Sequence, residues 1–405
     1  MAQHELGPLP PVPGFRFAAL PAGIRADGRA DLALAVADRV AGAAGLFTRN
    51  LVRAAPVELA SARLRAGRGR AIVVNSGCAN ACTGAPGLEA AERVTAAVAR
   101  GLGWDREDVL PASTGVIGRL LPADRIEAQV PGLVGALSPG SLGEFARAIL
   151  TTDRWPKVAE RALPGGGRVV AVGKGAGMIH PELGTLGDAD AGTPHATMLV
   201  FVFTDAVADP GTLERALVGA AAGTFNATSV DGDTSTNDCV LALASGATAA
   251  RPSLPELEAT LGAAFEALAR SMVRDGEGAE HVVELRVRGL AEVAACRAVA
   301  RTVATSLLVK TALHGRDANW GRLLAAAGRA GVGFDPGRAR ITIAGVEIVR
   351  AGVSVGAEAE ARAEAAMAAE DYVIELELGD SSASARYLTS DLGHGYVDVN
   401  ASYRT

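Results

Sequence analysis

Two short apolar runs enclose a long polar segment near the middle of the chain, and this pattern constrains the fold more than any other. The runs span residues 169–172 and 198–203, and the segment between them is rich in glycine and polar side chains. Apolar runs of this length, bounded by turn residues, are typical of buried strands. The pattern therefore predicts two core strands joined by a long loop. Thr197 stands at the start of the second strand, an unusual place for a hydroxyl, and is the first candidate nucleophile.

Strand-like and helical patterns alternate along the rest of the chain. This alternation predicts an α/β (or α+β) fold made of layers of sheet and helix. Residues 253–272 give the clearest helix, with Ser253 and Glu256 at the S-x-x-E spacing of a capping box. Residues 15–57 indicate strands and hairpins. Further strands are expected at residues 71–74, 281–287, 340–348 and 372–378, and further helices at residues 86–102, 142–149, 210–222 and 290–310 and between the last two strands.

The composition excludes several classes of protein. The chain has 405 residues, enough for two domains or one large α/β unit, and a net charge of −6. Its arginines are scattered and form no stripes with aromatic residues, so no nucleic-acid partner is expected. No apolar run approaches the roughly 18 residues that a membrane span requires, and the N-terminus lacks the pattern of a signal peptide. Four cysteines are too few for a disulfide framework. We therefore expect a soluble cytoplasmic protein.

Familiar ligand-binding motifs are incomplete in this chain. A phosphate-binding loop ending at Gly173 and Lys174 would need Ser or Thr next and a glycine in place of Arg168, but the next residue is Gly175. The segment DGDTSTND resembles a calcium loop, yet it lacks the glycine and the final glutamate of an EF-hand. The histidines are dispersed, which disfavours a zinc site, and no G-x-S-x-G elbow is present. No metal or cofactor is expected.

Segments of small residues that carry hydroxyl, amide or single charged groups recur at the ends of the predicted strands. Each one alone is explained as an ordinary polar loop. Together they favour an enzyme, since an α/β enzyme builds its site from loops at strand ends. The segments are NSGCANA (75–81), STG (113–115), TTD (151–153), KGAGM (174–178), SVDGDTSTND (229–238), RDGEG (274–278), HGRDANWG (314–321) and NASYRT (400–405).

Taken in their order, these segments resemble the signature of the ornithine acetyltransferase family, the glutamate N-acetyltransferases of arginine biosynthesis. KGAGMIHP followed by ATML is the central match, and the agreement extends to GLFTRN, NSGCANACTG, PASTGVIG, TTD, SVDGDTSTND, RDGEGA, GRDANWGR and N-x-x-Y-R-T. The resemblance covers nearly the whole chain. It implies a layered α/β fold related to the N-terminal-nucleophile-like hydrolases.

Members of this family cleave themselves within Ala-Thr, and the resemblance places the cleavage between Ala196 and Thr197. The cut would divide the chain into an α chain of residues 1–196 and a β chain of residues 197–405, which begins with the nucleophile. The family assembles as heterotetramers of two α and two β chains. A free α-amine titrates near 8, so Thr197 would supply both the attacking hydroxyl and the base that removes its proton.

The resemblance also implies roles for residues far from the cleavage point. Thr114 and Gly115 would donate a hydroxyl and a backbone N–H to the acetyl oxygen as negative charge forms on it. N-acetylornithine would acetylate Thr197, ornithine would leave, and glutamate would take the acetyl group to give N-acetylglutamate. Lys174 has an alternative role, which is to support the nucleophile electrostatically or to position its loop. The positions that match substrate-binding residues of the family are Thr151 or Thr152, Lys174, Thr197, Glu277, Asn400 and Thr405.

Two departures from the family pattern leave alternatives open. Residues 182–195 separate Pro181 from Ala196, where the family usually has a residue or two. This insert is either a surface loop, since loop-closure entropy grows slowly with length, or a segment that alters processing or donor specificity. Cys78 stands where the family commonly has Asn.

Three alternative functions therefore stay open. The first is a paralogue of specialised metabolism that acts on another acyl amino acid. The second is an amidohydrolase or aminopeptidase that uses the same nucleophile and passes the acyl group to water. The third is a binding protein that has lost catalysis. The sequence also leaves open whether acetyl-CoA serves as a further acetyl donor.

Overall fold

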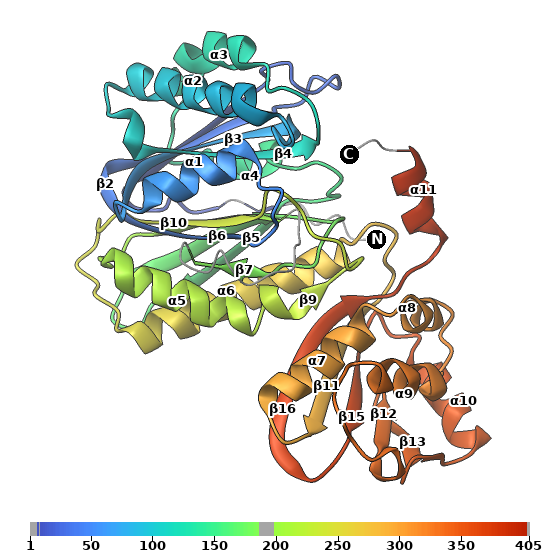
Figure 1. Cartoon of the computed structure of the whole chain (residues 1–405). Helices are drawn as coiled ribbons and strands as arrows, with labels where there is room; N and C mark the ends of the chain where they lie inside the picture. Colours follow the sequence, from blue (N-terminus) through green and yellow to red (C-terminus); the bar gives the residue numbers. More distant parts are fainter. Residues whose placement is uncertain (1–5, 8, 186–197, 403–405) are drawn as a thin grey trace. The chain divides into compact units, whose positions relative to one another are not determined.

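The computed structural model describes residues 6, 7, 9–185 and 198–402, which form two compact units. The first unit comprises residues up to 226 together with 233–268, and the second comprises 227–232 and the residues from 269 onward. Each unit has a sheet of its own with helices packed on it (Figure 1). The expected fold class, α/β with layers of sheet and helix, is confirmed.

The sheet of the first unit has nine strands among the described residues. They are β1 (Phe15–Leu20), β2 (Leu32–Thr48), β3 (Arg68–Cys78), β4 (Val109–Val116), β5 (Lys157–Ala162), β6 (Arg168–Lys174), β7 (Leu183–Gly184), β8 (Leu199–Thr204) and β10 (Cys239–Ala244). Their order is β4-β3-β2-β10-β8-β6-β5, with β1 and β7 also paired to β2. The pairing of β2 with β3 shifts register between Val36 and Ala41, and such a bulge bends a strand. The long strand β2 thereby links two halves of the sheet.

Helices cover the outer faces of both halves. Figure 1 shows α2 and α3 on the β3–β4 half and α5 and α6 on the half that contains β6 and β10. The helices of this unit are α1 (Ala55–Leu64), α2 (Gly84–Leu102), α3 (Ala123–Gly135), α4 (Leu142–Ala148), α5 (Pro210–Ala222) and the larger part of α6 (Leu254–Arg274), and short 3₁₀ turns lie at residues 106–108 and 225–227.

Alternate residues of β2 face two separate apolar cores. Leu32 and Leu34 belong to a core shared with α2 and α3, whereas Ala33 and Ala35 belong to a second core shared with α1, α4, β6, β8 and β10. This division follows from the two-residue period of a strand, which turns successive side chains to opposite faces. The second core therefore lies between the two halves of the sheet.

Five phenylalanines fill the centre of this second core, and each is at most 1% exposed. The ring of Phe203 in β8 lies 5.0 Å from that of Phe17 and 5.2 Å from that of Phe15, both edge to face. Phe145 of α4 contacts Phe17, Phe201 and Phe203 in the same geometry. Aromatic pairs in this arrangement stabilise a core beyond the area they bury. The cluster fixes β8, the strand that follows Thr197 in the sequence, against β1 and α4.

The second unit is a seven-stranded sheet with helices. Its strands are β9 (Thr228–Ser229), β11 (Val282–Gly289), β12 (Arg340–Ile343), β13 (Val346–Arg350), β14 (Val353–Ser354), β15 (Asp371–Glu377) and β16 (Ser381–Ser390), in the order β14-β13-β12-β15-β11-β16-β9. Its helices are α7 (Val293–Ala304), α8 (Leu307–His314), α9 (Trp320–Gly328), α10 (Ala357–Ala366) and α11 (His394–Ser402), and a 3₁₀ turn lies at residues 336–338.

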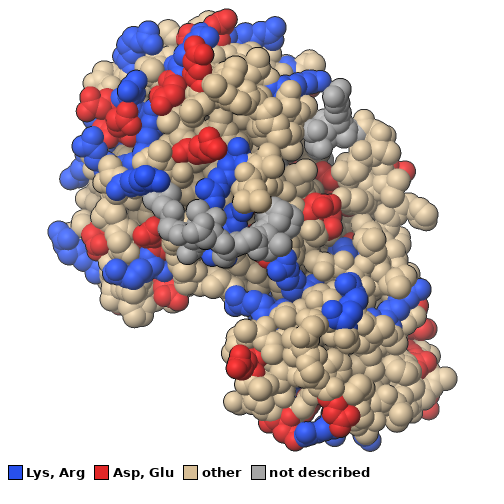
Figure 2. Space-filling model, in the orientation of Figure 1, with Lys and Arg blue, Asp and Glu red and all other residues tan. Residues whose placement is uncertain are grey.

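The expected strands at residues 169–172 and 198–203 are confirmed as β6 and β8. The capping box at the start of α6 is confirmed as well, because Glu256 accepts hydrogen bonds from the backbone N–H and the hydroxyl of Ser253, at 2.8 and 2.7 Å. Among the described residues, no helix has the length and apolar character to cross a bilayer. Basic and acidic side chains are mixed over the upper part of the face in Figure 2, in agreement with the scattered arginines of the sequence.

Several local expectations were wrong. Residues 75–78 and 113–115 were expected as loops, but they are the ends of β3 and β4, held by parallel pairing of the two strands. The expected helix at 290–310 is two helices, because Ser306 adopts an extended backbone between them. The expected strand at 340–348 is a hairpin of β12 and β13.

The insert expected at residues 182–195 begins as regular structure. Leu183 and Gly184 form β7 and pair with Thr48 and Phe47 of β2. Asn226 fixes the same strand by bonding both the N–H and the carbonyl of Leu183, at 2.8 and 3.0 Å. The rest of the insert, from residue 186, lies outside the described residues.

The phenylalanine cluster gives a first test of the fold. We expect Phe203→Ala to lower the free energy of unfolding by about 3–5 kcal/mol, because it leaves a cavity at the centre of the core. Val218→Ala on α5, where the valine is 41% exposed, is the matched control and should change stability by less than about 0.5 kcal/mol. Urea denaturation followed by circular dichroism measures both, and equal effects would contradict the packing described here.

Candidate active site

Lys174 is the last residue of β6, and its side chain is buried among hydroxyl groups. Its exposure is 1%. The ammonium nitrogen Nζ lies 2.8 Å from Oγ1 of Thr151 and 3.3 Å from Oγ1 of Thr114. Of the two adjacent threonines at 151 and 152, it is thus Thr151 whose hydroxyl reaches Lys174. A lysine ammonium only donates hydrogen bonds. Both hydroxyl oxygens therefore act as acceptors here, which leaves their hydrogens free to be donated elsewhere.

The end of β4 brings Thr114 and Gly115 to this lysine. β4 runs parallel to β3, and Gly115 pairs with Gly77. Gly115 has a φ of +128°, and a Cβ there would lie 2.4 Å from the carbonyl carbon of Gly77. Only glycine fits a left-handed backbone in such close contact. The local geometry thus explains why a glycine stands at position 115, and it leaves the backbone there uncovered by a side chain.

Asp153 is the buried counterion of the site. One carboxylate oxygen accepts hydrogen bonds from Lys157 Nζ at 2.7 Å and from the N–H of Gly175 at 2.6 Å. The other oxygen accepts the N–H of Thr151 at 3.2 Å and lies 3.7 Å from Lys174 Nζ. Asp153 thus holds both the TTD segment and the turn that follows β6.

Two lysines keep Asp153 ionised. Burial by itself raises the pKa of this carboxyl, but the charges of Lys157 and Lys174 and the hydrogen bonds to Lys157 and Gly175 outweigh it and hold the pKa well below its usual range. An opposite charge within a few ångströms favours the charged form of a carboxyl. The site therefore carries one buried carboxylate shared by two buried lysines.

The start of β8 lies directly beside Lys174. The antiparallel register of β6 and β8 pairs Lys174 with Leu199, and Met198 precedes that residue. Ala196 and Thr197 themselves lie outside the described residues. Leu199, two residues after the candidate nucleophile Thr197 in the sequence, is therefore the direct neighbour of Lys174 in the sheet.

Asp238, which precedes β10, binds the first residue of this strand end. Its Oδ1 accepts the N–H of Met198, and its Oδ2 is buried with no hydrogen-bond partner among the described residues. Burial raises the pKa of the Asp238 carboxyl well above its ordinary value, against the opposing effects of the Met198 N–H and the Lys174 charge. The site thus holds two buried carboxyl groups, Asp153 and Asp238, whose pKa values are shifted in opposite directions, and perturbed pKa values are common at functional sites.

Asn75 and Asn237 fasten three of the motif segments to each other. Ser113 donates to the side-chain oxygen of Asn75 at 2.6 Å. Asn237 donates to the carbonyls of Ala79 and Ser113 at 2.7 and 2.8 Å. Burial raises the pKa of the Cys78 thiol, so this residue has the environment of a structural cysteine. These three motifs therefore support the strand ends that carry Thr114 and Asp238.

The remaining expected residues lie in the second unit. Asn400 of α11 donates from Nδ2 to a carboxylate oxygen of Glu277 at 2.8 Å and to the carbonyl of Tyr396 at 3.0 Å. The loop that carries Glu277 meets the start of α11 closely, because a Cβ on Gly278 would lie 2.2 Å from the backbone nitrogen of Tyr396. The structure thus brings Glu277 and Asn400 together, and Thr405 lies outside the described residues.

Three ionisable residues of the site were missed in the sequence. Asp153 stood in the TTD motif without a role, Lys157 had no motif, and Asp238 closed the segment SVDGDTSTND. The sequence offers one indication of such residues, which is an ionisable side chain close to the end of an apolar run. Among the described residues, no cluster of three or more histidine, cysteine or acidic side chains has the geometry of a metal site.

Comparison with known proteins gives a match along almost the whole chain. A family model described as the ArgJ family matches residues 16–405. The arginine biosynthesis bifunctional protein ArgJ of Geobacter sulfurreducens is 43% identical over 404 residues, which cover 97% of this chain and 100% of the relative. The protein of the same name from Nitratidesulfovibrio vulgaris is 44% identical over 399 residues, 97% of this chain and 98% of the relative.

A solved structure of an ornithine acetyltransferase is also similar in sequence. The Mycobacterium tuberculosis enzyme, in a complex with ornithine, is 42% identical. The alignment covers 42% of this chain and 94% of the solved chain, with a TM-score of 0.41.

The charge of Asp153 can be tested by an isosteric change. We expect Asp153→Asn to lower the free energy of unfolding at pH 7 by about 3–5 kcal/mol, because two buried lysines lose their counterion. The lowered pKa of Asp153 means that its contribution is present above the ordinary value of 3.8 and disappears as the pH falls through the lower folded value. The difference between variant and wild type should therefore shrink below pH ~4. Urea denaturation at pH 7 and pH 3 measures it.

Asp124→Asn is the control for this experiment. The Asp124 side chain is 88% exposed and is paired with Arg93, and exposed pairs of this kind contribute little to stability. A similar loss in both variants, or a loss for Asp153→Asn that does not depend on pH, would contradict the role of Asp153 as a shared counterion.

The raised pKa of Asp238 predicts the opposite pH dependence. The folded chain holds this proton to a higher pH than the unfolded chain, so stability falls as the pH rises above 3.8 toward the folded value. Asp238→Asn cannot ionise, and we expect its melting temperature to depend less steeply on pH between about 5 and 8. Thermal unfolding measures this. The comparison is made between Thr197→Ala and the double variant Thr197→Ala/Asp238→Asn, so that neither protein is cleaved. If the melting temperatures of the two proteins depend on pH in the same way, the pKa of Asp238 is not raised by burial.

Proposed function

Since the chain belongs to the ArgJ family, we propose that it is an ornithine acetyltransferase of arginine biosynthesis that uses Thr197 as its nucleophile. It transfers the acetyl group of N-acetylornithine to glutamate and gives ornithine and N-acetylglutamate. The observation that carries the assignment of the site is the contact of Lys174 with Thr114 and Thr151, at the strand position paired with Leu199.

The nucleophile is made by self-cleavage. The hydroxyl of Thr197 attacks the carbonyl carbon of Ala196, the peptide C–N bond breaks, and the acyl group passes to oxygen as an ester. The α-amine of Thr197 is freed as the C–N bond breaks. Water then hydrolyses the ester, which releases the carboxylate of Ala196 and restores the Thr197 hydroxyl. The same hydroxyl donors that stabilise the acetyl oxygen during turnover can stabilise the oxyanion of this step. The products are residues 1–196 and 197–405.

Turnover follows a ping-pong course. The α-amine of Thr197 takes the proton of its own hydroxyl, and the oxygen attacks the acetyl carbon of N-acetylornithine. Ornithine leaves with that proton, and an acetyl ester remains on Thr197. The amine of glutamate then attacks the ester, which forms N-acetylglutamate and restores the hydroxyl. The donors for the developing negative charge are the Thr114 hydroxyl and the N–H of Gly115, of which one is worth about 3–4 kcal/mol of barrier.

The free hydrogen of Thr114 supports this assignment. Its oxygen accepts from Lys174 Nζ at 3.3 Å, so the hydroxyl hydrogen is available to an oxyanion. The positive charge of Lys174 lies behind the hydroxyl and strengthens it as a donor. Thr151 has the same arrangement at 2.8 Å, which suits a hydroxyl that binds a polar group of the substrate.

The substrate offers charges of both signs. Its carboxylate suits a cation or hydroxyl donors, such as Lys174 and Thr151. The side-chain ammonium of ornithine suits a carboxylate, and Glu277, which accepts a hydrogen bond from Asn400, is our candidate. Thr152 and the terminal Thr405 complete the substrate-binding positions in this proposal. No metal or cofactor takes part in these steps.

The proposal extends to assembly and location. Two α chains of residues 1–196 and two β chains of residues 197–405 would form a heterotetramer in the cytoplasm. Acetyl-CoA is a second donor to be tested with glutamate, since the acyl-enzyme would be the same. Release of acetate without acceptor would instead identify a hydrolase.

Replacement of the nucleophile tests the proposal. We expect Thr197→Ala to remain a single chain of about 41.0 kDa and to lose acetyl transfer by more than about 10⁴-fold, because both hydroxyl and cleavage are removed. Intact mass and an assay of N-acetylglutamate from N-acetylornithine with and without glutamate measure the two effects. Thr311→Val, which removes an exposed hydroxyl of α8 that has no role in the proposal, serves as the control. A fully active wild-type chain that is never cut, or turnover by Thr197→Ala, would refute the mechanism.

A further inference from the structure

We infer that Arg25 is a positioning residue of this site: it fixes the main chain that carries Thr151 and so holds the Thr151 hydroxyl against Lys174. The inference rests on the proposed function, because it concerns how the acyl donor is bound. Arg25 lies 125 residues before Leu150 in the sequence, and no motif contains it.

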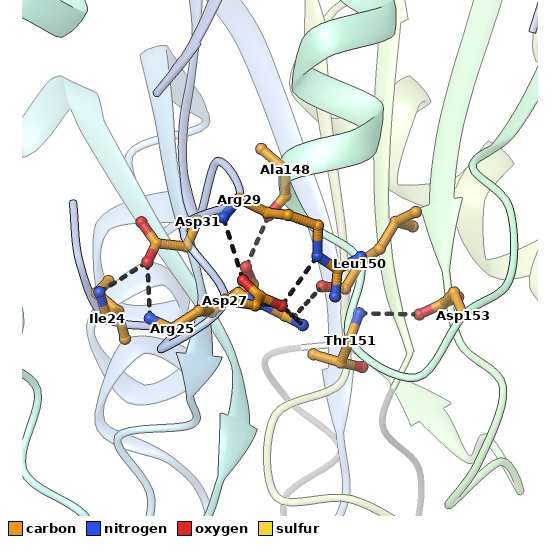
Figure 3. Close-up of polar contacts among 10 residues, drawn as sticks. Ile24, Arg25, Asp27, Arg29, Asp31, Ala148, Leu150, Thr151 and Asp153 are labelled. Carbon is orange, nitrogen blue, oxygen red and sulfur yellow. Dashed lines mark hydrogen bonds and ion pairs between the residues drawn. The ribbon is translucent and has the colours of Figure 1, made fainter. Parts of the chain in front are cut away.

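The loop between β1 and β2 presents Arg25 in a fixed conformation. Asp31 is fully buried at the end of this loop. Its carboxylate accepts the backbone N–H of Ala22 at 2.6 Å. It also accepts the backbone N–H groups of Ile24 and Arg25, at 2.7 and 2.8 Å (Figure 3). A carboxylate that accepts three backbone N–H groups of one loop restrains that loop, because such charge-assisted hydrogen bonds are strong. The backbone of Arg25 is therefore held in place before its side chain makes any contact.

The guanidinium of Arg25 links the loop between β1 and β2 to the segment that follows α4. Its Nη1 donates to the carbonyl of Leu150 at 3.0 Å, and its Nη2 donates to Asp27 at 2.8 Å. Figure 3 shows the Arg25 side chain between Asp27 and Leu150, with Thr151 next along the chain. The side chain is only 12% exposed, so it acts mainly inside the protein.

The aliphatic part of the Arg25 side chain packs on the end of β3, which pairs with Gly115 of β4. A Cβ on Gly77 would lie 2.9 Å from Cγ of Arg25. Gly77 pairs with Gly115 across β3 and β4. One side chain thus touches the backbone that supports Gly115 and the carbonyl that precedes Thr151.

Residues 149–151 depend on such contacts, because they follow the end of α4 and belong to no helix or strand. Ser76 donates to the carbonyl of Ala148 at 2.7 Å. Asp153 accepts the N–H of Thr151 at 3.2 Å. Arg25 supplies the contact between these two, at Leu150. Without it, the Leu150 carbonyl loses the Arg25 guanidinium as a donor, and the Thr151 hydroxyl can drift from Lys174.

An arginine suits this position better than a lysine. Its planar group donates to the Asp27 carboxylate and to the Leu150 carbonyl at the same time, whereas a lysine is a point charge without a fixed fork. Arg29 is a natural control, because its Nε also donates to Asp27, at 2.9 Å, but its side chain is 58% exposed. Loss of Arg29 therefore removes a partner of Asp27 and leaves the contact with Leu150 in place.

Hydrogen–deuterium exchange tests the positioning without any use of activity. We expect Arg25→Met, which keeps most of the stem, to speed exchange in the peptide that spans residues 148–153, whereas Arg29→Met leaves it unchanged. Arg25→Lys should give an intermediate rate. Exchange elsewhere in the unit should stay the same, which separates local release from unfolding. Unchanged exchange at 148–153 in Arg25→Met would overturn the inference, whatever the chain catalyses.

Kinetics test whether Arg25 acts through Thr151. We expect Arg25→Met to raise KM for N-acetylornithine by about 10- to 100-fold, as small misplacements of a binding group do, while cleavage into two chains still goes to completion. In a Thr151→Val background the same change should add less than about twofold, since residues that act through one another are not additive. If the two substitutions together raise KM by the product of their separate effects, Arg25 acts independently of Thr151, and the positioning role is overturned.

The wild-type assay separates this inference from the proposed function. A wild-type chain without acetyl transfer would contradict the proposed function, while the exchange experiment would still decide on the role of Arg25. Suppose instead that the wild-type chain transfers acetyl groups normally, and that Arg25→Met and Thr151→Val change KM independently of each other. This result would contradict the role of Arg25 and leave the proposed function intact.

Discussion

The carboxylate of Asp153 is the interaction on which the rest of the site depends. It lies 3.7 Å from the buried ammonium of Lys174 and supplies the opposite charge that favours the protonated form of a buried lysine. A charged lysine only donates hydrogen bonds, and so both Thr114 and Thr151 receive a hydrogen bond and turn their own hydrogens outward. A neutral amine could accept instead, and the hydroxyls would then point the other way. One buried charge pair therefore sets the direction of every hydroxyl donor that we assign to the site.

The second carboxyl, Asp238, complements the first because its pKa is shifted in the opposite direction. A protonated Asp238 does not compete with Asp153 for Lys174, yet it still accepts the N–H of Met198. Two carboxyl groups in one site divide their roles when their environments move the pKa values apart. Here one supplies charge and the other holds the start of β8. Asp153 lies in the segment between α4 and β5 and Asp238 directly before β10, and 85 residues of sequence separate them.

The sequence predicted the parts of this arrangement that depend on local pattern. β6 and β8 were found because apolar runs flanked by turn residues identify buried strands, and the capping box marked the start of α6. The break at Ser306 was missed because the Ala/Val-rich pattern continues across it without glycine or proline. Asp153, Lys157 and Arg25 were missed for another reason. Their partners are brought to them by the pairing of distant strands, and no spacing in the sequence records that pairing.

The sheet also explains how the proposed cut can leave the site intact. β8 would begin the β chain, but it pairs with β6 of the α chain on one side and with β10 on the other, and β10 pairs with β2. The two chains would therefore share one sheet and one phenylalanine core, in which Phe17 and Phe145 of one chain contact Phe203 of the other. Breaking the peptide bond before Thr197 removes a covalent link but none of these contacts. The new N-terminus would stay where Asp238 and Lys174 hold the following residues, so that cleavage creates a nucleophile without rebuilding its surroundings.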